Sequence, residues 1–222
     1  MPVWTSPDLL AAFKREVGLN DANEYDDTTD LYPRLARAQV QLIEAIASRY
    51  PNPLYSAPFA LTPSADRTTF SFGTDAQGQP ILPLGWVQIS PNARAFIGDE
   101  FVGWVEGTDF LDEGTQIRVT ANRTFTGTLY CRAVLTPPDI AAAVDPVIQP
   151  VSARALIAVL AARDFAGEGA AQPSLVAAMQ AKWNDPLTGF PALMLTYRRR
   201  YRGGGALLEP RLWYRGSPDL TA

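Results

Sequence analysis

The chain of 222 residues contains no histidine, a single cysteine and only two lysines. The missing histidine removes the commonest general base, the Ser/His and Cys/His nucleophile systems and the commonest metal ligand. Cys131 has no second cysteine to pair with, and its alternating surroundings, TLYCRAVL, predict a small core side chain. No P-loop, GxGxxG, GxSxG, CxxC or HExxH pattern is present. We therefore expect no catalytic, cofactor or metal site, and a protein that is not an enzyme.

Carboxylates are the remaining candidates for chemistry. The chain has adjacent pairs at 99–100 and 112–113, with Asp109 nearby, and two carboxylates suffice for glycoside hydrolysis. Both pairs fall at turn signals, where Asp and Glu serve solvation and local hydrogen bonding. An acidic segment further upstream starts like an EF-hand loop, but Asp26 stands where that loop needs Gly, and Tyr32 where it needs Glu. Structural roles are therefore favoured over catalysis and over calcium binding.

The charge is unevenly placed along the chain. The net charge is -4, yet residues 186–222 hold six arginines against two carboxylates. Arginine forms bidentate pairs with carboxylates and stacks on aromatic rings, which suits fixed contacts better than lysine does. The C-terminal segment therefore favours a specific contact with a partner.

Helical periodicity marks four segments. Apolar residues recur at three- and four-residue spacings, with Pro in the first turn or Gly just past the end of several segments. The third segment is apolar on every side from residue 155 to 162, which predicts a helix buried at the centre of a domain. That run is shorter than the roughly 20 residues that span a bilayer. The predicted helices are 6–17, 30–50, 150–165 and 173–184.

Between residues 54 and 135 the apolar period changes from near 3.6 to near 2. Short runs rich in β-branched and aromatic residues alternate with turn signals and predict a small antiparallel sandwich or barrel. Trp86 and Trp104 are candidates for a carbohydrate platform, although aromatic residues in alternating strands are more often core or cross-strand pairs. The predicted strands are 68–72, 86–90, 93–97, 101–106, 116–120 and 128–135.

These signals predict an α+β fold, in which a helical domain of two long and several shorter helices carries an inserted small antiparallel β domain and an extended C-terminal arm. In the arm, LMLTYRRRYR is interpreted as one exposed strand. The predicted divisions are 1–53 for the N-terminal helical part, 54–135 for the inserted β-sandwich or barrel, 136–185 for the C-terminal helical part and 186–222 for the arm.

The arm mixes arginines with aromatic and apolar residues. The run YRRRYRGGG is compatible with nucleic-acid binding through phosphate contacts and base stacking, and also with a solvated tail. The acidic chain offers no general basic face, and the arm is too apolar to remain free in water, so we expect it to dock on another protein. The residues predicted to bind the partner are Arg198, Arg199, Arg200, Tyr201, Arg202, Leu212, Trp213 and Tyr214.

Three runs carry a resemblance to a known family: TDLYPRLARAQVQLIEAIASRYP, PFALTPSADRTTFSFG and GTDFLDEGTQIRVTANRTFTGTLYCRAV. With the Ala-rich helix and the arm that follow them, they resemble head-to-tail adaptor (connector) proteins of tailed bacteriophages. The resemblance implies a subunit of a ring, usually of twelve copies, beneath the portal, with a C-terminal segment that grips portal subunits. The segment 54–135 departs from the simplest members, which are nearly all helical.

The function implied by the resemblance is that of a structural virion protein joining the portal to the tail or neck. Its expected partners are the portal protein, further copies of itself in a dodecameric ring and a downstream neck or tail protein, with DNA only passing through the channel. No membrane contact and no cofactor is expected, and the location is the neck of the virion after assembly in the host cytoplasm. Two alternatives stay open: a carbohydrate- or host-binding β module on a helical stem, and another neck or stopper protein.

Overall fold

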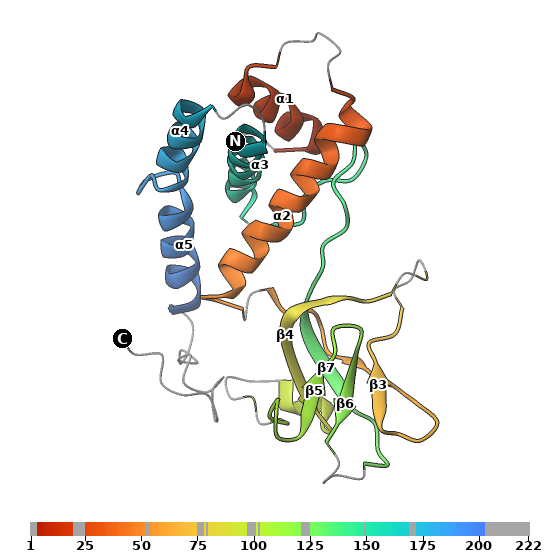
Figure 1. Cartoon of the computed structure of the whole chain (residues 1–222). Helices are drawn as coiled ribbons and strands as arrows, with labels where there is room; N and C mark the ends of the chain where they lie inside the picture. The colour runs from red at the N-terminus through yellow and green to blue at the C-terminus, as the bar shows by residue number, and fades with distance from the viewer. Residues whose placement is uncertain are drawn as a thin grey trace. The chain divides into compact units, whose positions relative to one another are not determined.

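The structure of the chain, a computed structural model, describes residues 4–19, 25–51, 54–74, 78, 80–96, 101, 103–120, 125–148, 150–168 and 172–202, the last three by their backbone alone. The chain divides into two compact units (Figure 1). The residues up to Arg49 together with Pro137–Arg200 form the helical unit, and Tyr50–Thr136 form the β unit. The fold is therefore α+β, as the sequence predicts.

The centre of the helical unit is α3 (Ala155–Glu168), which follows the 3-10 turn Val151–Arg154. This helix packs against α1 (Ser6–Val17), α2 (Tyr32–Ala47) and α4 (Pro173–Trp183). Its all-round apolar surface explains this position, because every face that a neighbour covers must be apolar. Its buried residues are Leu156, Ile157, Ala158, Leu160, Ala161, Ala162 and Ala166.

The first turn of α1 is held by hydrogen bonds from the residue that precedes it. Thr5 is the N-cap, and both its backbone N–H and its hydroxyl donate to Asp8 Oδ2, at 3.0 and 2.8 Å. Ser6 is buried, and its hydroxyl donates to the carbonyl of Val144 at 2.7 Å. Gly18 ends the helix with a φ of 70°, a conformation that glycine adopts without steric cost.

The predicted apolar stripe of α2 is buried, and the π-helical turn Asp27–Leu31 leads into it. Gln39 on the same helix is also buried: its Nε2 donates to the carbonyl of Pro138 at 3.2 Å, and its Oε1 accepts the N–H of Val147 at 2.9 Å. Gln39 therefore fixes the returning chain against α2 through both ends of its amide.

The β unit consists of two antiparallel sheets around one core. Their strand orders are β1-β7-β4 and β2-β3-β6-β5. The strands are β1 (Phe59–Ala60), β2 (Thr62–Pro63), β3 (Thr69–Ser71), β4 (Pro83–Ser90), β5 (Phe110–Asp112), β6 (Gln116–Val119) and β7 (Tyr130–Leu135). The core contains Leu61, Phe70, Phe72, Ile89, Phe110, Ile117, Val119, Leu129, Cys131 and Ala133.

Two of the predicted strands are corrected by the structure. Ala93–Phe96 is a 3-10 helix, because Asn92 Oδ1 accepts the N–H of Arg94 at 3.0 Å and turns the chain. In the segment 101–106, the described residues form only isolated bridges, at Trp104 and Glu106.

The start of the predicted extended arm is also corrected. The strand expected in LMLTYRRRYR is the helix α5 (Phe190–Arg202). Phe190, Leu193, Met194 and Tyr197 are buried, and their spacing is that of one helical face. The rest of the arm, residues 203–222, lies outside the described residues. None of the described helices combines the length and apolar composition needed to cross a membrane.

Candidate interaction surface

The side chains predicted to bind a partner are brought together only in part. Arg198 and Arg199 are exposed in the last two turns of α5, and the backbone of residues 200–202 continues this helix. Cations at a helix C-terminus are favoured by the helix dipole, so the arginine run and the end of α5 support one another. Leu212, Trp213 and Tyr214, the other predicted binding residues, lie outside the described residues.

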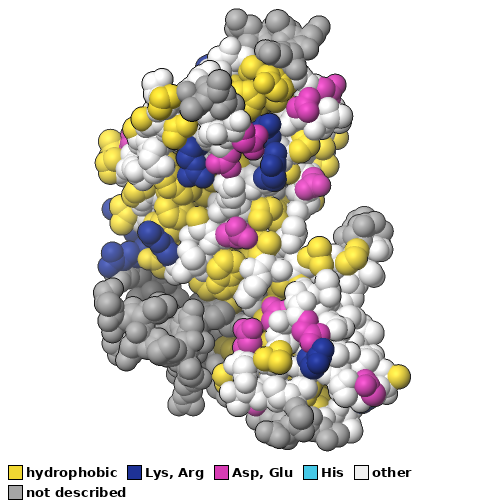
Figure 2. All heavy atoms as spheres, in the orientation of Figure 1, with side chains coloured by type: hydrophobic (Ala, Val, Ile, Leu, Met, Phe, Trp, Pro, Cys, Tyr) yellow, Lys and Arg dark blue, Asp and Glu magenta, His cyan; other side chains and the backbone are white. Residues whose placement is uncertain are grey.

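The helix α4 has an unusual surface for an apolar helix. Seven of the eleven residues in its sequence PSLVAAMQAKW are hydrophobic, but only Met179 is buried. The other apolar side chains of α4 are exposed or half-buried. The segment that follows α4 in the chain adds two exposed leucines, Leu187 and Leu195. We call this set the α4–α5 surface, and it comprises Leu175, Val176, Ala177, Ala178, Ala181, Leu187 and Leu195. Figure 2 shows hydrophobic side chains spread over this side of the helical unit.

The connection between α4 and α5, residues 184–189, is a tightly built corner. Asp185 Oδ1 accepts the N–H of Leu187 at 2.7 Å and of Thr188 at 3.0 Å. These two backbone donors hold the pKa of Asp185 below its usual value, because they stabilise the ionised carboxylate. Beyond the turn, the rings of Trp183 and Phe190 stack with centroids 4.6 Å apart and planes 9° apart.

Gly189 makes this corner possible. A Cβ at this position would lie 2.4 Å from the carbonyl oxygen of Trp183 and 2.6 Å from that of Lys182. Only glycine allows the backbone to approach this closely. The corner therefore holds Leu187 in a fixed place with 84 % of its surface exposed, more than any other large hydrophobic side chain of the described residues.

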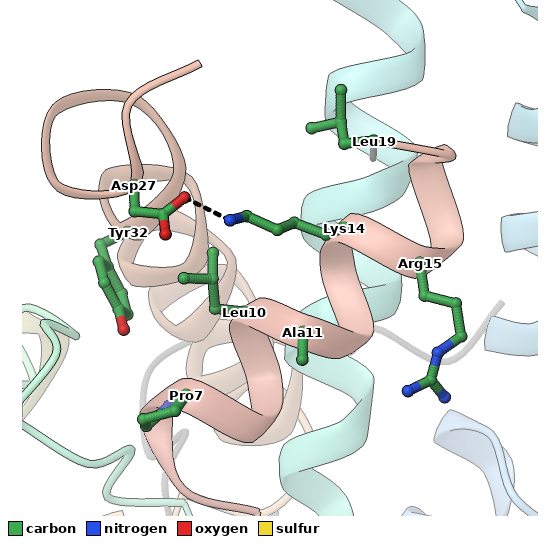
Figure 3. A pocket seen from close by; sticks show the side chains of 8 residues that line it. All are labelled: Pro7, Leu10, Ala11, Lys14, Arg15, Leu19, Asp27 and Tyr32. Atoms are coloured by element: carbon green, nitrogen blue, oxygen red, sulfur yellow. Dashed lines mark ion pairs between the residues drawn. The ribbon is translucent and has the colours of Figure 1, made fainter. Parts of the chain in front are cut away.

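A second surface feature is an open groove of about 570 Å³ between α1 and the start of α2 (Figure 3). Its apolar lining is Pro7, Leu10, Ala11, Leu19 and the ring of Tyr32. On one side Lys14 Nζ pairs with Asp27 Oδ1 at 2.7 Å. Arg15 extends away from this pair in Figure 3, and it has no carboxylate within ion-pair distance among the described residues. Among the described residues, the groove thus combines an apolar floor with a guanidinium group, that of Arg15, that no carboxylate pairs with.

The titratable groups of the β unit have structural roles. The thiol of Cys131 is fully buried, and burial raises its pKa well above the usual value, so the reactive thiolate is disfavoured. Asp109 Oδ2 accepts the N–H of Val105 at 2.9 Å, and Asp112 Oδ1 accepts that of Gly114 at 2.8 Å. Glu113 pairs with Arg118 at 2.6 Å. Within the described ranges no three His, Cys, Asp or Glu side chains are grouped to hold a metal ion.

The two tryptophans considered for a carbohydrate platform differ. Trp104 packs against the β core, and its ring meets that of Phe125 edge to face at a centroid distance of 5.3 Å. The ring of Trp104 therefore packs inside the β unit, as expected for a core or cross-strand aromatic residue. Trp86 is half-buried on β4.

Comparison with models of known protein families finds none that matches the chain. A comparison with curated proteins likewise finds no match.

Sequence reasoning overlooked the corner and the groove. The corner has a recognisable signal, because NDPLTG between two apolar helices combines Asp-Pro with a following Gly and leaves Leu187 in the turn itself. The groove has none, since it depends on the distance between α1 and the segment that leads into α2.

Proposed function

We propose that the chain is a structural subunit of the head-to-tail adaptor ring of a tailed bacteriophage, joining the portal to the neck or tail. The observation that carries this proposal is the α4–α5 surface. An apolar helix with one buried residue, followed by a rigid corner with an exposed leucine, leaves apolar area in water that another protein can cover. Such a surface suits a protein whose work is assembly.

The resemblance to adaptor proteins supports the same function. Its first run includes α2 and the end of the turn that leads into it. The other two runs include β1 to β3, β5, β6 and most of β7. The resemblance covers the helical parts and the arm, and the β unit is where the chain departs from the simplest members of the family.

In this proposal the exposed arginines of α5 and the segment that follows this helix contact the portal. Arg198 and Arg199, exposed on α5, pair with portal carboxylates together with the arginines that follow them. Leu212, Trp213 and Tyr214 fill an apolar site on the portal. Guanidinium groups on a helix and an aromatic anchor further along the chain would then bind one partner in two places, which strengthens binding through effective concentration.

The remaining surfaces have roles that follow from ring geometry. The net charge of -4 disfavours adhesion of DNA as it passes through the channel. The β unit, with a hydrophobic core of its own, meets the next neck or tail protein.

The test is binding to the portal protein encoded with this chain. Two variants are informative: a chain that ends at Arg202, and Arg198→Glu/Arg199→Glu in the full chain. Both leave the buried face of α5 in place, so both should keep the helical circular dichroism of the parent. We expect each to bind the portal at least about tenfold more weakly, as loss of one or two charge-assisted contacts or of an apolar anchor implies.

The matched control is Arg94→Glu/Arg118→Glu, which makes the same charge change at exposed positions of the β unit. It should bind the portal like the parent. A third variant combines the truncation with the α5 charge reversal. If this variant bound the portal as tightly as the parent, the role assigned to the arm would be refuted.

A further inference from the structure

We propose that neighbouring copies in the ring contact each other by inserting the Leu187 corner of one copy into the groove beside α1 of the next. The inference rests on the proposed ring function and names the self-contact that closes the ring. The occupant of the groove is thus a second copy of this chain, and each copy contributes two different faces.

The corner has the properties of an inserting element. Its backbone is fixed by the Asp185 carboxylate and by the close approach at Gly189, so little conformational freedom is lost on docking. Leu187 is 84 % exposed at its tip, and burial of this side chain is the main apolar gain available there.

The groove matches the corner in size and lining. A volume of about 570 Å³ is ample for a leucine side chain with part of its turn. Leu10 and Tyr32 form walls that are themselves held in the core, since each is only 7 % exposed. The site is therefore preformed and apolar at its floor.

Charge complementarity favours this occupant. Arg15 at the edge of the groove has no carboxylate partner among the described residues, while Lys14 is already paired with Asp27. The corner brings its own carboxylate, Asp185, whose Oδ2 is not used by the two backbone N–H groups of the turn. A guanidinium opposite this carboxylate makes a charge-assisted contact beside the buried leucine.

The two faces also point in the directions that a ring needs. Lys14 pairs with Asp27 before α2, whereas Glu16, two residues further on, pairs with Lys182 near the end of α4. Side chains two residues apart in a helix point to nearly opposite sides. The wall of the groove formed by Asp27 and the corner that follows α4 therefore lie on opposite sides of α1. A head-to-tail contact between such faces propagates from copy to copy and closes when the rotation allows.

Cysteine cross-linking tests this contact directly. Cys131 is fully buried, so the parent chain provides a silent background. The variants Leu187→Cys and Ala11→Cys are prepared separately, and both positions are exposed. The two variants are then mixed and cross-linked by oxidation or with a short bis-maleimide. The mixture is tested both as concentrated protein and bound to the portal. We expect cross-linked dimers in the mixture and none with either variant alone. The double variant should give covalent oligomers up to the closed ring.

Leu111→Cys, 46 % exposed on β5, replaces Ala11→Cys in the matched control mixture and should give only background. Leu187→Ser and Arg15→Glu in the otherwise unchanged chain should each weaken self-association of copies bound to the portal, the first by about 10- to 100-fold. The proposed contact would be overturned if Leu187→Cys alone formed dimers. It would also be overturned if the mixture gave no more cross-linked dimer than the control, both in concentrated protein and on the portal.

Portal binding and particle mass by light scattering are measured on the same samples, so that the two proposals can fail separately. If rings form on the portal but the cross-link does not, the adaptor function is supported and the proposed contact is refuted. If the cross-link forms but the chain does not bind the portal, the contact is supported and the adaptor function is refuted.

Discussion

Replacement of Gly189 by alanine tests the rigidity of the corner with a single methyl group. The new Cβ would lie 2.4, 2.6 and 2.7 Å from the carbonyl oxygens of Trp183, Lys182 and Asp185. No side-chain rotation relieves a contact with backbone oxygens, so the end of α4 and the start of α5 must move apart. Overpacking of this kind costs about 1–3 kcal/mol, and alanine is also a poorer residue than glycine just before a helix.

The movement has a second cost, because the stacking of Trp183 on Phe190 depends on the same turn. Such aromatic pairs contribute about 0.5–1.5 kcal/mol. We therefore expect Gly189→Ala to lower the free energy of unfolding of the helical unit by about 2–4 kcal/mol, measured by urea denaturation with far-ultraviolet circular dichroism.

Gly167→Ala is the control, and it should change the free energy of unfolding in the opposite direction. Gly167 lies inside α3, and a Cβ there meets no atom within 4 Å. Alanine should therefore stabilise the helix by about 0.5–1 kcal/mol. If Gly189→Ala proved as stable as the parent, the close approach at the corner and its rigidity would both be wrong.

Three further predictions concern the core, the corner and the cysteine. Leu42→Ala, at a fully buried position of α2, should cost about 2–5 kcal/mol in urea denaturation, whereas Leu195→Ser at the 46 % exposed position should change stability by less than about 0.5 kcal/mol. The folded pKa of Asp185 lies below its unfolded value, so the ionised carboxylate stabilises the corner above about pH 4, and this contribution is lost as the pH falls through the folded pKa. Protection of the Leu187 and Thr188 amides, measured relative to their intrinsic exchange rates, should accordingly fall in acid in the parent and show no such step in Asp185→Asn. A step of equal size in both proteins would contradict the assignment. Cys131 should react with a thiol reagent only after denaturant is added, and rapid labelling of the folded protein would show that its burial is incomplete.

The long helices could be predicted because core burial imposes their pattern over many residues. In α2 the stripe Leu35, Leu42 and Ile46 recurs over three turns, and in α3 the all-round apolar surface admits only a central position. The β unit could be predicted as a class, since β4 and β7 have eight and six residues and are long enough to be recognised between turn signals. Strands of two or three residues, such as β1 and β5, are too short for a period to be detected.

The error at α5 has an instructive physical cause. Its buried face, Phe190, Leu193, Met194 and Tyr197, has clear helical spacing, but consecutive arginines and the apolar run before them suggested an exposed strand. Sequence reasoning did find Arg198 and Arg199 as exposed candidates, because charge run and exposure are both local properties. It could not find the groove, because Lys14 and Asp27 meet only after α1 and the chain before α2 have packed.

The contact proposed between copies also has an energetic consequence for assembly. Full burial of one leucine contributes about 1.5–3 kcal/mol, and an exposed ion pair such as one between Arg15 and Asp185 adds about 1 kcal/mol or less. Association costs at least about 4 kcal/mol of lost translational and rotational freedom. This contact is therefore too weak by itself to hold free copies together. Once the arms of several copies are bound to one portal, the arms have already met most of the cost of bringing neighbouring copies together, so the same weak contact can form between them. On this reasoning the portal serves as the template on which the ring closes, and Leu187→Ser should impair ring closure on the portal more than it impairs binding of the first copy.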